Sequence, residues 1–217
     1  SLLKVESLSH SFIDKVLYEN ASFDLHKGEH MGIVGQNGAG KSTLMKILVG
    51  EIIPDKGDIK WQPNIQIGHL DQYAEIDEGY TISKYLKRAF YDLYEMEKRM
   101  NKLYEESAMT GDENQLLKAA EIQGLLEAHD FYSVDSITNK VAAGLGIDVI
   151  GMNRVIGELS GGQRAKVILA KLLLEEPNIL LLDEPTNFLD KEHVEWLANY
   201  LMNFEGAFIV VSHDFVS

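Results

Sequence analysis

The chain alternates short apolar runs with polar turns over its first seventy residues and again after residue 160. The uninterrupted apolar runs 179–182 and 208–211 are typical of parallel strands buried on both faces. Apolar residues three and four positions apart predict helices over 161–174 and 192–201. The remaining pattern predicts strands at 2–6, 22–25, 30–34, 59–61 and 66–70, and a helix over 43–49 that ends at Gly50. We therefore expect an α/β fold whose N-terminal part also contains antiparallel strands.

Residues 81–131 follow a different pattern, with apolar residues at steps of three and four on both sides of a turn at Thr110-Gly111-Asp112. The two sets are Leu86, Ala89, Leu93, Met96, Met100 and Leu103, then Leu116, Ala119, Ile122, Leu126 and His129. A single stripe of this kind is most often ordinary core packing. Two stripes separated by only a turn predict an antiparallel helical hairpin.

The 217 residues carry a net charge of −14 and suffice for one domain, or one domain with an insertion, that buries a core without covalent cross-links. The chain has no cysteine, which excludes disulfide and zinc–thiolate sites and fits a reducing compartment, so we expect a cytoplasmic protein. No apolar run approaches the ~18–20 residues of a membrane span, and we expect no direct membrane insertion. An acidic chain is repelled by bulk nucleic acid, although a local basic element can still contact RNA.

Residues 35–42 fit the phosphate-loop pattern G-x-x-x-x-G-K-[ST] between a predicted strand and a predicted helix. Glycines let backbone N–H groups converge on phosphate oxygens, and the following helix adds the positive end of its dipole. In such a loop Lys41 contacts the β- and γ-phosphates, and Ser42 offers its hydroxyl to Mg²⁺. A chance glycine-rich turn is the alternative, which the flanking strand and helix disfavour. The candidate ATP-binding residues here are Gly35, Gln36, Asn37, Gly38, Ala39, Gly40, Lys41, Ser42 and Thr43.

The apolar run 179–182 ends in two carboxylates, Asp183 and Glu184. Alone, such a pair is a common strand end. After a phosphate loop it is typical of a metal-binding strand, in which Asp183 holds Mg²⁺ directly or through water. Glu184 is then the candidate general base that orients and deprotonates the attacking water. The two motifs together predict a site that binds and hydrolyses Mg-ATP.

A third motif, Leu159-Ser160-Gly161-Gly162-Gln163, precedes that strand and begins a predicted helix. A serine at a helix start, beside free N–H groups, can bind phosphate, although a plain N-cap is the simpler interpretation of this motif alone. In this order, the three motifs resemble the ATP-binding cassette (ABC) superfamily. The resemblance covers nearly the whole chain outside 81–131. It implies a P-loop NTPase fold of the α/β class, with an antiparallel β subdomain and a helical subdomain that carries the hairpin.

The resemblance implies further site residues. Gln72 matches the glutamine that senses the γ-phosphate and the metal, which makes Ser42, Gln72 and Asp183 the expected metal set. His213 matches the switch histidine that contacts the γ-phosphate, and it joins Glu184 and Lys41 as an expected catalytic residue. Phe12 matches the aromatic residue that stacks on adenine.

The resemblance also implies a partner. Cassettes of this family pair head to tail, so Ser160, Gly161, Gly162 and Gln163 would act on the nucleotide of a second cassette, in the same chain or in a homodimer. Asp190 matches the family's dimer-contact loop. The chain ends four residues after His213, whereas cassettes continue further, so we expect the end of the cassette and a second cassette in a longer protein.

Two features resemble the ABC-F branch, soluble twin-cassette proteins that act on ribosomes. Asn187 follows Asp-Glu-Pro-Thr, where transporter cassettes more often carry a small residue, although Phe188 stands where ABC-F proteins usually have histidine. The interval from Gln72 to Ser160 is longer than the corresponding interval in a transporter-type cassette by about two average helices of ~11–12 residues each. ABC-F proteins insert an arm hairpin here. This divides the chain into a cassette at 1–80 and 132–217 and an arm-like insertion at 81–131.

Basic residues cluster in this insertion. Between positions 84 and 102 there are six basic residues and three acidic residues. The basic residues are Lys84, Lys87, Arg88, Lys98, Arg99 and Lys102. Positive charge attracts a phosphate backbone, so contact with ribosomal RNA is expected, with a solvated helix face as the alternative.

The expected function is hydrolysis of Mg-ATP by an ABC-F cassette that acts on the ribosome in translation or antibiotic protection. The main alternative is the ATPase subunit of an ABC membrane transporter. A chromosome- or repair-type cassette is disfavoured, because the insertion is too short for a long coiled coil.

Overall fold

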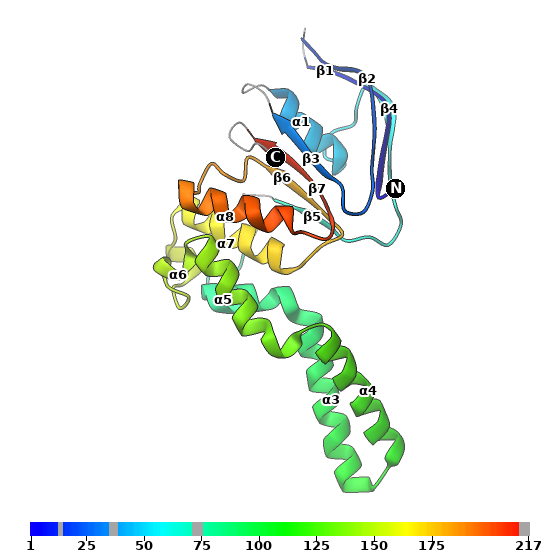
Figure 1. The fold of residues 1–217 in the computed structure, drawn as a ribbon, viewed down its shortest axis with the longest axis vertical. Helices are drawn as coiled ribbons and strands as arrows, with labels where there is room; N and C mark the ends of the chain where they lie inside the picture. The colour runs from blue at the N-terminus through cyan, green and yellow to red at the C-terminus, as the bar shows by residue number, and fades with distance from the viewer. Residues whose placement is uncertain (13–14, 35–38, 71–75, 213–217) are drawn as a thin grey trace.

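The computed structural model describes residues 1–12, 15–34, 39–70 and 76–212, and their side chains other than those of 12, 15–21, 34 and 39–41. Within these residues a parallel sheet has the strand order β3-β7-β6-β5, and an antiparallel sheet has the order β2-β1-β4 (Figure 1). The parallel strands are β3 (His30–Val34), β5 (Ile67–His69), β6 (Ile179–Asp183) and β7 (Ala207–Ser212). The antiparallel strands are β1 (Leu3–Phe12), β2 (Lys15–Leu25) and β4 (Lys56–Trp61). The predicted α/β fold with antiparallel N-terminal strands is confirmed.

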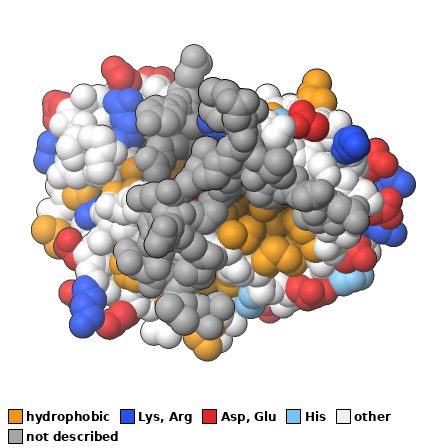
Figure 2. Space-filling model, turned by 90° about the horizontal axis from the view of Figure 1, so that it is seen from above, with side chains coloured by type: hydrophobic (Ala, Val, Ile, Leu, Met, Phe, Trp, Pro, Cys, Tyr) orange, Lys and Arg blue, Asp and Glu red, His pale blue; other side chains and the backbone are white. Residues whose placement is uncertain are grey.

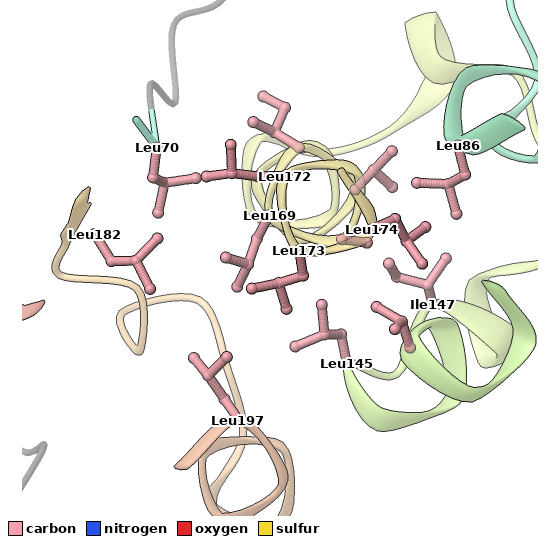
Figure 3. Packing of buried hydrophobic residues seen from close by; sticks show 14 of the residues in the cluster. Leu70, Leu86, Leu145, Ile147, Leu169, Leu172, Leu173, Leu174, Leu182 and Leu197 are labelled. Atoms are coloured by element: carbon pink, nitrogen blue, oxygen red, sulfur yellow. The ribbon is translucent and has the colours of Figure 1, made fainter. Parts of the chain in front are cut away.

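The parallel sheet is buried on both faces. Helix α1 (Ala39–Leu48) and the antiparallel sheet cover one face, and α7 (Gly161–Leu174) and α8 (Lys191–Met202) cover the other. Figure 3 shows the hydrophobic cluster on the face covered by α7 and α8, with Leu169, Leu172 and Leu173 of α7 at its centre. The absence of alternation in β6 and β7 follows from this arrangement, because the side chains of 179–182 and 207–211 are all buried in one or the other apolar layer.

Strands β1 and β2 are longer than the pattern predicts. Ser7 has a left-handed backbone (φ 52°), and the register of β1 shifts there against both neighbouring strands. A bulge of this kind breaks the two-residue period, so the alternation ends near Glu6 although the pairing continues to Phe12. Helix α1 also begins earlier than predicted, at Ala39 instead of residue 43.

The helices α3 (Tyr91–Thr110) and α4 (Glu113–Ala128) form an antiparallel hairpin that extends away from the sheets (Figure 1). Gly111 ends α3 in a left-handed conformation (φ 72°), and the side chain of Asp112 accepts a hydrogen bond from the Asn114 N–H and begins α4. The interior of the hairpin is a small cluster around Met100, Ala119 and Leu126, closed at its base by Phe131 and Val134.

Four residues of the predicted seam lie elsewhere. Leu86 belongs to α2 (Ile82–Lys87) and packs in the larger core with α7. Ala89 lies in the short 3₁₀ turn (Arg88–Phe90) that separates α2 from α3, and it packs against the same core. Leu116 is 47% exposed, and His129 is exposed beyond the end of α4. Spacing alone cannot distinguish these positions, because it reports a helical face and not the partner that covers it.

The stretch 132–158 has no predicted element, but the structure contains α5 (Val134–Gly144) and α6 (Ile147–Ile150), flanked by 3₁₀ turns at Phe131–Ser133 and Ile156–Glu158. Val134, Ile137 and Val141 lie at helical spacing and could have indicated α5. Among the described helices, none combines the length and apolarity needed to cross a membrane.

Two glycines within helices provide a test of this packing. A Cβ at Gly144 in α5 would lie 2.0–2.6 Å from ring atoms of Trp196 in α8, whereas a Cβ at Gly124 in α4 would have nothing within 4 Å. Gly124→Ala is therefore expected to stabilise the protein by about 0.5–1 kcal/mol, since alanine loses less backbone entropy in a helix. Gly144→Ala is expected to destabilise it by about 1–3 kcal/mol, because the clash outweighs that gain. Urea unfolding measures both, and two changes of the same sign would contradict the described contact between α5 and α8.

Candidate functional site

The carboxyl ends of the parallel strands meet at one edge of the sheet. Val34 at the end of β3 pairs with Ser212 at the end of β7, and Asp183 at the end of β6 pairs with Val211. Helix α1 begins at Ala39, a few residues after β3. The crevice beyond the carboxyl ends of parallel strands is the usual place for a ligand in such sheets. Figure 2, the view from above, shows charged side chains of both signs around the periphery and an apolar patch nearer the middle.

Helix α1 is held firmly at this edge. Leu44, Met45, Ile47 and Leu48 are buried in the cluster that covers one face of the sheet, beside side chains of β6 and β7. Because the helix starts at Ala39, soon after the end of β3, the positive end of its dipole lies at this edge of the sheet. Ser42, in the first turns of this helix, is half-buried. The fold therefore presents a helix start of the kind that can bind anions, with a hydroxyl beside it.

Asp183 is suited to a cation. Its Oδ1 atom is buried, and within the described part of the chain it has no hydrogen-bond partner. A buried carboxylate oxygen without a partner is costly, and a bound cation removes that cost. Magnesium takes oxygen ligands and retains several waters, so a carboxylate and a hydroxyl on neighbouring elements form a donor set that suits it. The residues present therefore fit the metal that the sequence predicts.

Glu184 occupies a strained turn. Its φ of 49° is left-handed, a conformation that costs a non-glycine residue of order 1–3 kcal/mol. Its N–H donates a 2.7 Å hydrogen bond to the carbonyl of Val211. The next turn is held by buried Thr186, whose Oγ1 lies 3.3 Å from the Oγ of Ser212. These bonds fix the direction in which the chain leaves β6, and with it the position of the Glu184 backbone.

The contact between Thr186 and Ser212 was missed by the sequence analysis. Both residues are buried and polar, and they lie 26 positions apart on different elements. The sequence offers a partial signal, since Thr186 belongs to the motif Asp-Glu-Pro-Thr. Nothing in that motif indicates which residue the hydroxyl meets.

Asp190 lies at the N-cap position of α8, where its carbonyl accepts a hydrogen bond from the Val194 N–H at 2.9 Å. Its side chain is 85% exposed and lies 3.9 Å from Nδ1 of His193. An exposed carboxylate at this position can reach another molecule.

The motif around Ser160 forms a helix start on an open surface. The Gln163 N–H donates to Ser160 Oγ at 3.2 Å, and the Ser160 N–H donates to Gln163 Oε1 at 3.0 Å, which is a capping box. Gly161 and Gly162 are exposed, and a Cβ at Gly161 would meet nothing within 4 Å. The N-cap interpretation of the motif is thus what the structure shows locally. Ser160, Gly161 and Gly162 are all exposed at this helix start, so the cap is compatible with a phosphate site.

Some predicted residues lie outside this description. Phe12 ends β1 and Lys41 lies in the first turn of α1, but their side chains are not described. The same holds for the side chain of Ala39, and Gly40 also lies in this first turn. The residues that lie outside the described ranges altogether are Gly35, Gln36, Asn37, Gly38, Gln72 and His213.

Comparison with protein families matches residues 18–187 to the family described as ABC transporter. The chain belongs to this family and is an ABC ATPase cassette, a domain of a family of ATP-hydrolysing enzymes. Over 99% of its length it is 49% identical to the uncharacterized ABC transporter ATP-binding protein YfmM of Bacillus subtilis, of which it spans 42%. Over 91% of its length it is 34% identical to the energy-dependent translational throttle protein EttA of Escherichia coli, of which it spans 36%. The chain therefore spans less than half the length of these relatives.

Solved structures show the same fold. The ATP-binding subunit of an ABC transporter matches 99% of this chain and 80% of its own, with a TM-score of 0.66 at 20% identity. The archaeal ribosome recycling factor aABCE1, in complex with the ribosomal stalk protein aP1, matches 97% of this chain and 34% of its own, with a TM-score of 0.64 at 26% identity.

The buried Asp183 oxygen leads to a prediction about metal and stability. Asp183→Asn is expected to stabilise the ligand-free protein by about 1 kcal/mol, because it removes the negative charge from a carboxylate whose buried Oδ1 atom has no hydrogen-bond partner among the described residues. For a protein of 217 residues this corresponds to a rise in Tm of roughly 2–4 °C. Added Mg²⁺ and ATP should raise the Tm of the parent protein, whereas they should have little effect on the Tm of the Asp183→Asn variant. Thermal unfolding with and without EDTA measures both effects, and equal magnesium-dependent shifts in parent and variant would contradict the metal role.

Proposed function

We propose that the strand-end site binds Mg-ATP and that Glu184 is the general base of its hydrolysis. The backbone of residues 35–43 and the Lys41 ammonium would bind the phosphates, and Ser42, Gln72 and Asp183 would hold the metal. Bound magnesium neutralises negative charge on the phosphate oxygens as the bond to the leaving group breaks. The support is the arrangement of Asp183 and Glu184 at the end of a rigid buried strand, opposite the start of α1.

In this proposal Glu184 orients a water molecule and accepts its proton as the oxygen attacks the γ-phosphorus. The bond between that phosphorus and the β,γ-bridging oxygen breaks, which yields ADP and phosphate. Positioning carries much of the acceleration in phosphoryl transfer, so the strained, firmly held turn at Glu184 suits the role. His213 would contact the γ-phosphate, and Phe12 would stack on the adenine.

A second cassette would complete the site. Ser160, Gly161, Gly162 and Gln163 would contact the nucleotide held by that partner, and Asp190 would lie in the contact between the two. The support is exposure, since Ser160, the two glycines and the Asp190 carboxylate all lie on open surface. The partner cassette would lie in the same chain or in a second copy.

Glu184→Gln is expected to keep ATP affinity within about twofold of the parent and to lower kcat by about 10²-fold or more, because the amide cannot accept the proton. The matched control is Lys41→Ala, which removes a charge directed at the phosphates and should abolish ATP binding itself. Nucleotide titration and phosphate release distinguish the two effects. Parent-rate turnover by Glu184→Gln in a closed pair of cassettes would show that another group is the base.

We further propose that this is the N-terminal cassette of an ABC-F protein that acts on the ribosome in the cytoplasm, in translation or in antibiotic protection. The observation that carries this proposal is the α3–α4 hairpin, which projects from the cassette as an isolated pair of helices (Figure 1). Lys98, Arg99 and Lys102 lie exposed within about one turn of α3. Lys98 is paired with Glu95 at 3.1 Å, so Arg99 and Lys102 are the stronger candidates for contact with phosphate.

The relatives support the same proposal. EttA is named for translation, and the chain is also 31% identical over 98% of its length to ABC transporter F family member 5 of Arabidopsis thaliana, of which it spans 32%. The alternative, the ATPase subunit of a membrane transporter, would require a membrane-spanning partner and leaves the basic hairpin without a function.

The ribosome proposal is tested with the full-length protein carrying Glu184→Gln, which should cosediment with ribosomes in ATP. Reversing the three hairpin charges (K98E/R99E/K102E) should weaken this association and reduce the dependence of log K on log salt by roughly 2–3, since each lost phosphate contact removes ~0.7–0.9. The matched control reverses three exposed lysines outside the hairpin (K27E/K56E/K60E), which changes the net charge equally. If the full-length protein with Glu184→Gln alone fails to bind ribosomes, the ABC-F proposal is contradicted. Equal weakening by both triple variants would contradict the role of the hairpin.

A further inference from the structure

Residues 78–83 form a short antiparallel ladder with residues 152–157, directly before the motif at 159–163. The first segment leads into α2 and the hairpin, and the second leads into α7. Thr81 and Val155 form an isolated β-bridge at the centre of the ladder. The flanking backbone bonds are 2.9–3.0 Å long and run from Ile82 N–H to Arg154, Ser83 N–H to Met152, Ile156 N–H to Tyr80 and Gly157 N–H to Glu78.

An ion pair joins the first of these segments to α7, on the other side of the motif. Nη2 of Arg164, in α7, lies 3.1 Å from Oε1 of Glu78. Glu78 is also packed closely against the 3₁₀ turn, because a Cβ at Gly157 would lie 3.2 Å from both the Cβ and the carbonyl oxygen of Glu78. The side chain of Arg164 is 28% exposed and that of Glu78 is 68% exposed. An exposed pair of this kind contributes little to global stability.

The position of Arg164 is unfavourable for the helix itself. It lies one residue after Gln163, near the N-terminal end of α7, where the helix dipole repels a cation. The carboxylate of Glu78 compensates for that repulsion. Helix formation therefore does not account for an arginine at this position, whereas a contact between α7 and the segment at 78 does.

The two contacts enclose the motif at 159–163. Gly157 is bonded to Glu78 before the motif, and Arg164 is paired with Glu78 after it. The motif, which forms the N-cap and first turn of α7, is thus flanked on both sides by contacts to one residue, Glu78. That residue lies six positions after Gln72, the expected γ-phosphate sensor of the chain's own site.

We propose that Glu78 and Arg164 are positioning residues, which hold Ser160, Gly161 and Gly162 in the orientation needed to contact the nucleotide of the partner cassette. This rests on the proposed composite site. Loss of the pair leaves the ladder and the fold in place but removes the side-chain contact that holds the first turn of α7 against Glu78. The pair acts on turnover through the orientation of the motif, and it leaves binding of nucleotide at the chain's own phosphate loop unaffected.

The test uses the full-length protein with Arg164→Glu, Glu78→Arg and the double swap E78R/R164E. Each single variant should lower kcat by about tenfold or more, toward the ~100-fold that a 1 Å misplacement can cost. The Kd for ATP at this cassette and the Tm should stay near the parent values. The double swap restores the pair with reversed charges and should recover most of the lost turnover. The control is Lys171→Ala, whose 2.6 Å pair with Glu175 lies at the other end of α7; it should leave kcat unchanged.

Three results would overturn the proposal. Parent-like kcat in both single variants would show that the pair positions nothing. A double swap as slow as Arg164→Glu would show that Arg164 acts alone, for example by direct contact with a phosphate. Ser160→Phe serves as the reference for the composite site: if this bulky residue leaves kcat unchanged, the composite site itself is wrong and the positioning role falls with it. A slow Ser160→Phe beside a parent-like Arg164→Glu overturns only the role of the pair.

Discussion

Strand β6 is packed on both faces, with Ile179 and Leu181 in the cluster shared with α1 and Leu180 and Leu182 in the cluster shared with α7 and α8. Burial of each such side chain contributes about 1.5–3 kcal/mol, so the position and direction of the strand are strongly determined. Asp183 must then emerge at the sheet edge beside β7, and the chain must turn at once at Glu184. The same clusters hold α1 on one side and α7 on the other. The carboxylates and the start of α1 therefore share one rigid support, which is what a catalytic arrangement requires.

The hairpin is connected to this support both by side-chain packing and by backbone hydrogen bonds. Its root, α2, is part of the larger cluster through Ile82 and Leu86, whereas α3 and α4 have a cluster of their own. The ladder between residues 78–83 and 152–157 connects the same root to the segment that leads into α7. A force on the hairpin can therefore reach the residues before α7 through backbone hydrogen bonds as well as through side-chain packing. The fold of this chain thus places the root of the hairpin directly beside the segment that leads into Ser160.

Sequence reasoning succeeded where the information is local and contiguous. The buried strands, α7, α8 and the turn at Gly111 follow from runs and spacings within one element, and the structure contains them. It was inaccurate where a tertiary contact changes the local pattern. The bulge at Ser7 hid the second half of β1, and Leu86 was placed in the hairpin because a helical face does not reveal what covers it. The exposed Leu116 has the same explanation.

For the site, the order of three short motifs was enough to indicate an ABC ATPase, because each motif is a contiguous peptide whose chemistry depends on its own residue types. The sequence by itself thus determined the fold class, the nucleotide chemistry and the existence of a hairpin. Three features were decided only by the tertiary structure. The Oδ1 atom of Asp183 is buried without a hydrogen-bond partner among the described residues, Thr186 contacts Ser212, and Glu78 pairs with Arg164. The physical reason is that these contacts join residues far apart in the chain. They exist only after the two clusters and the ladder have brought their elements together.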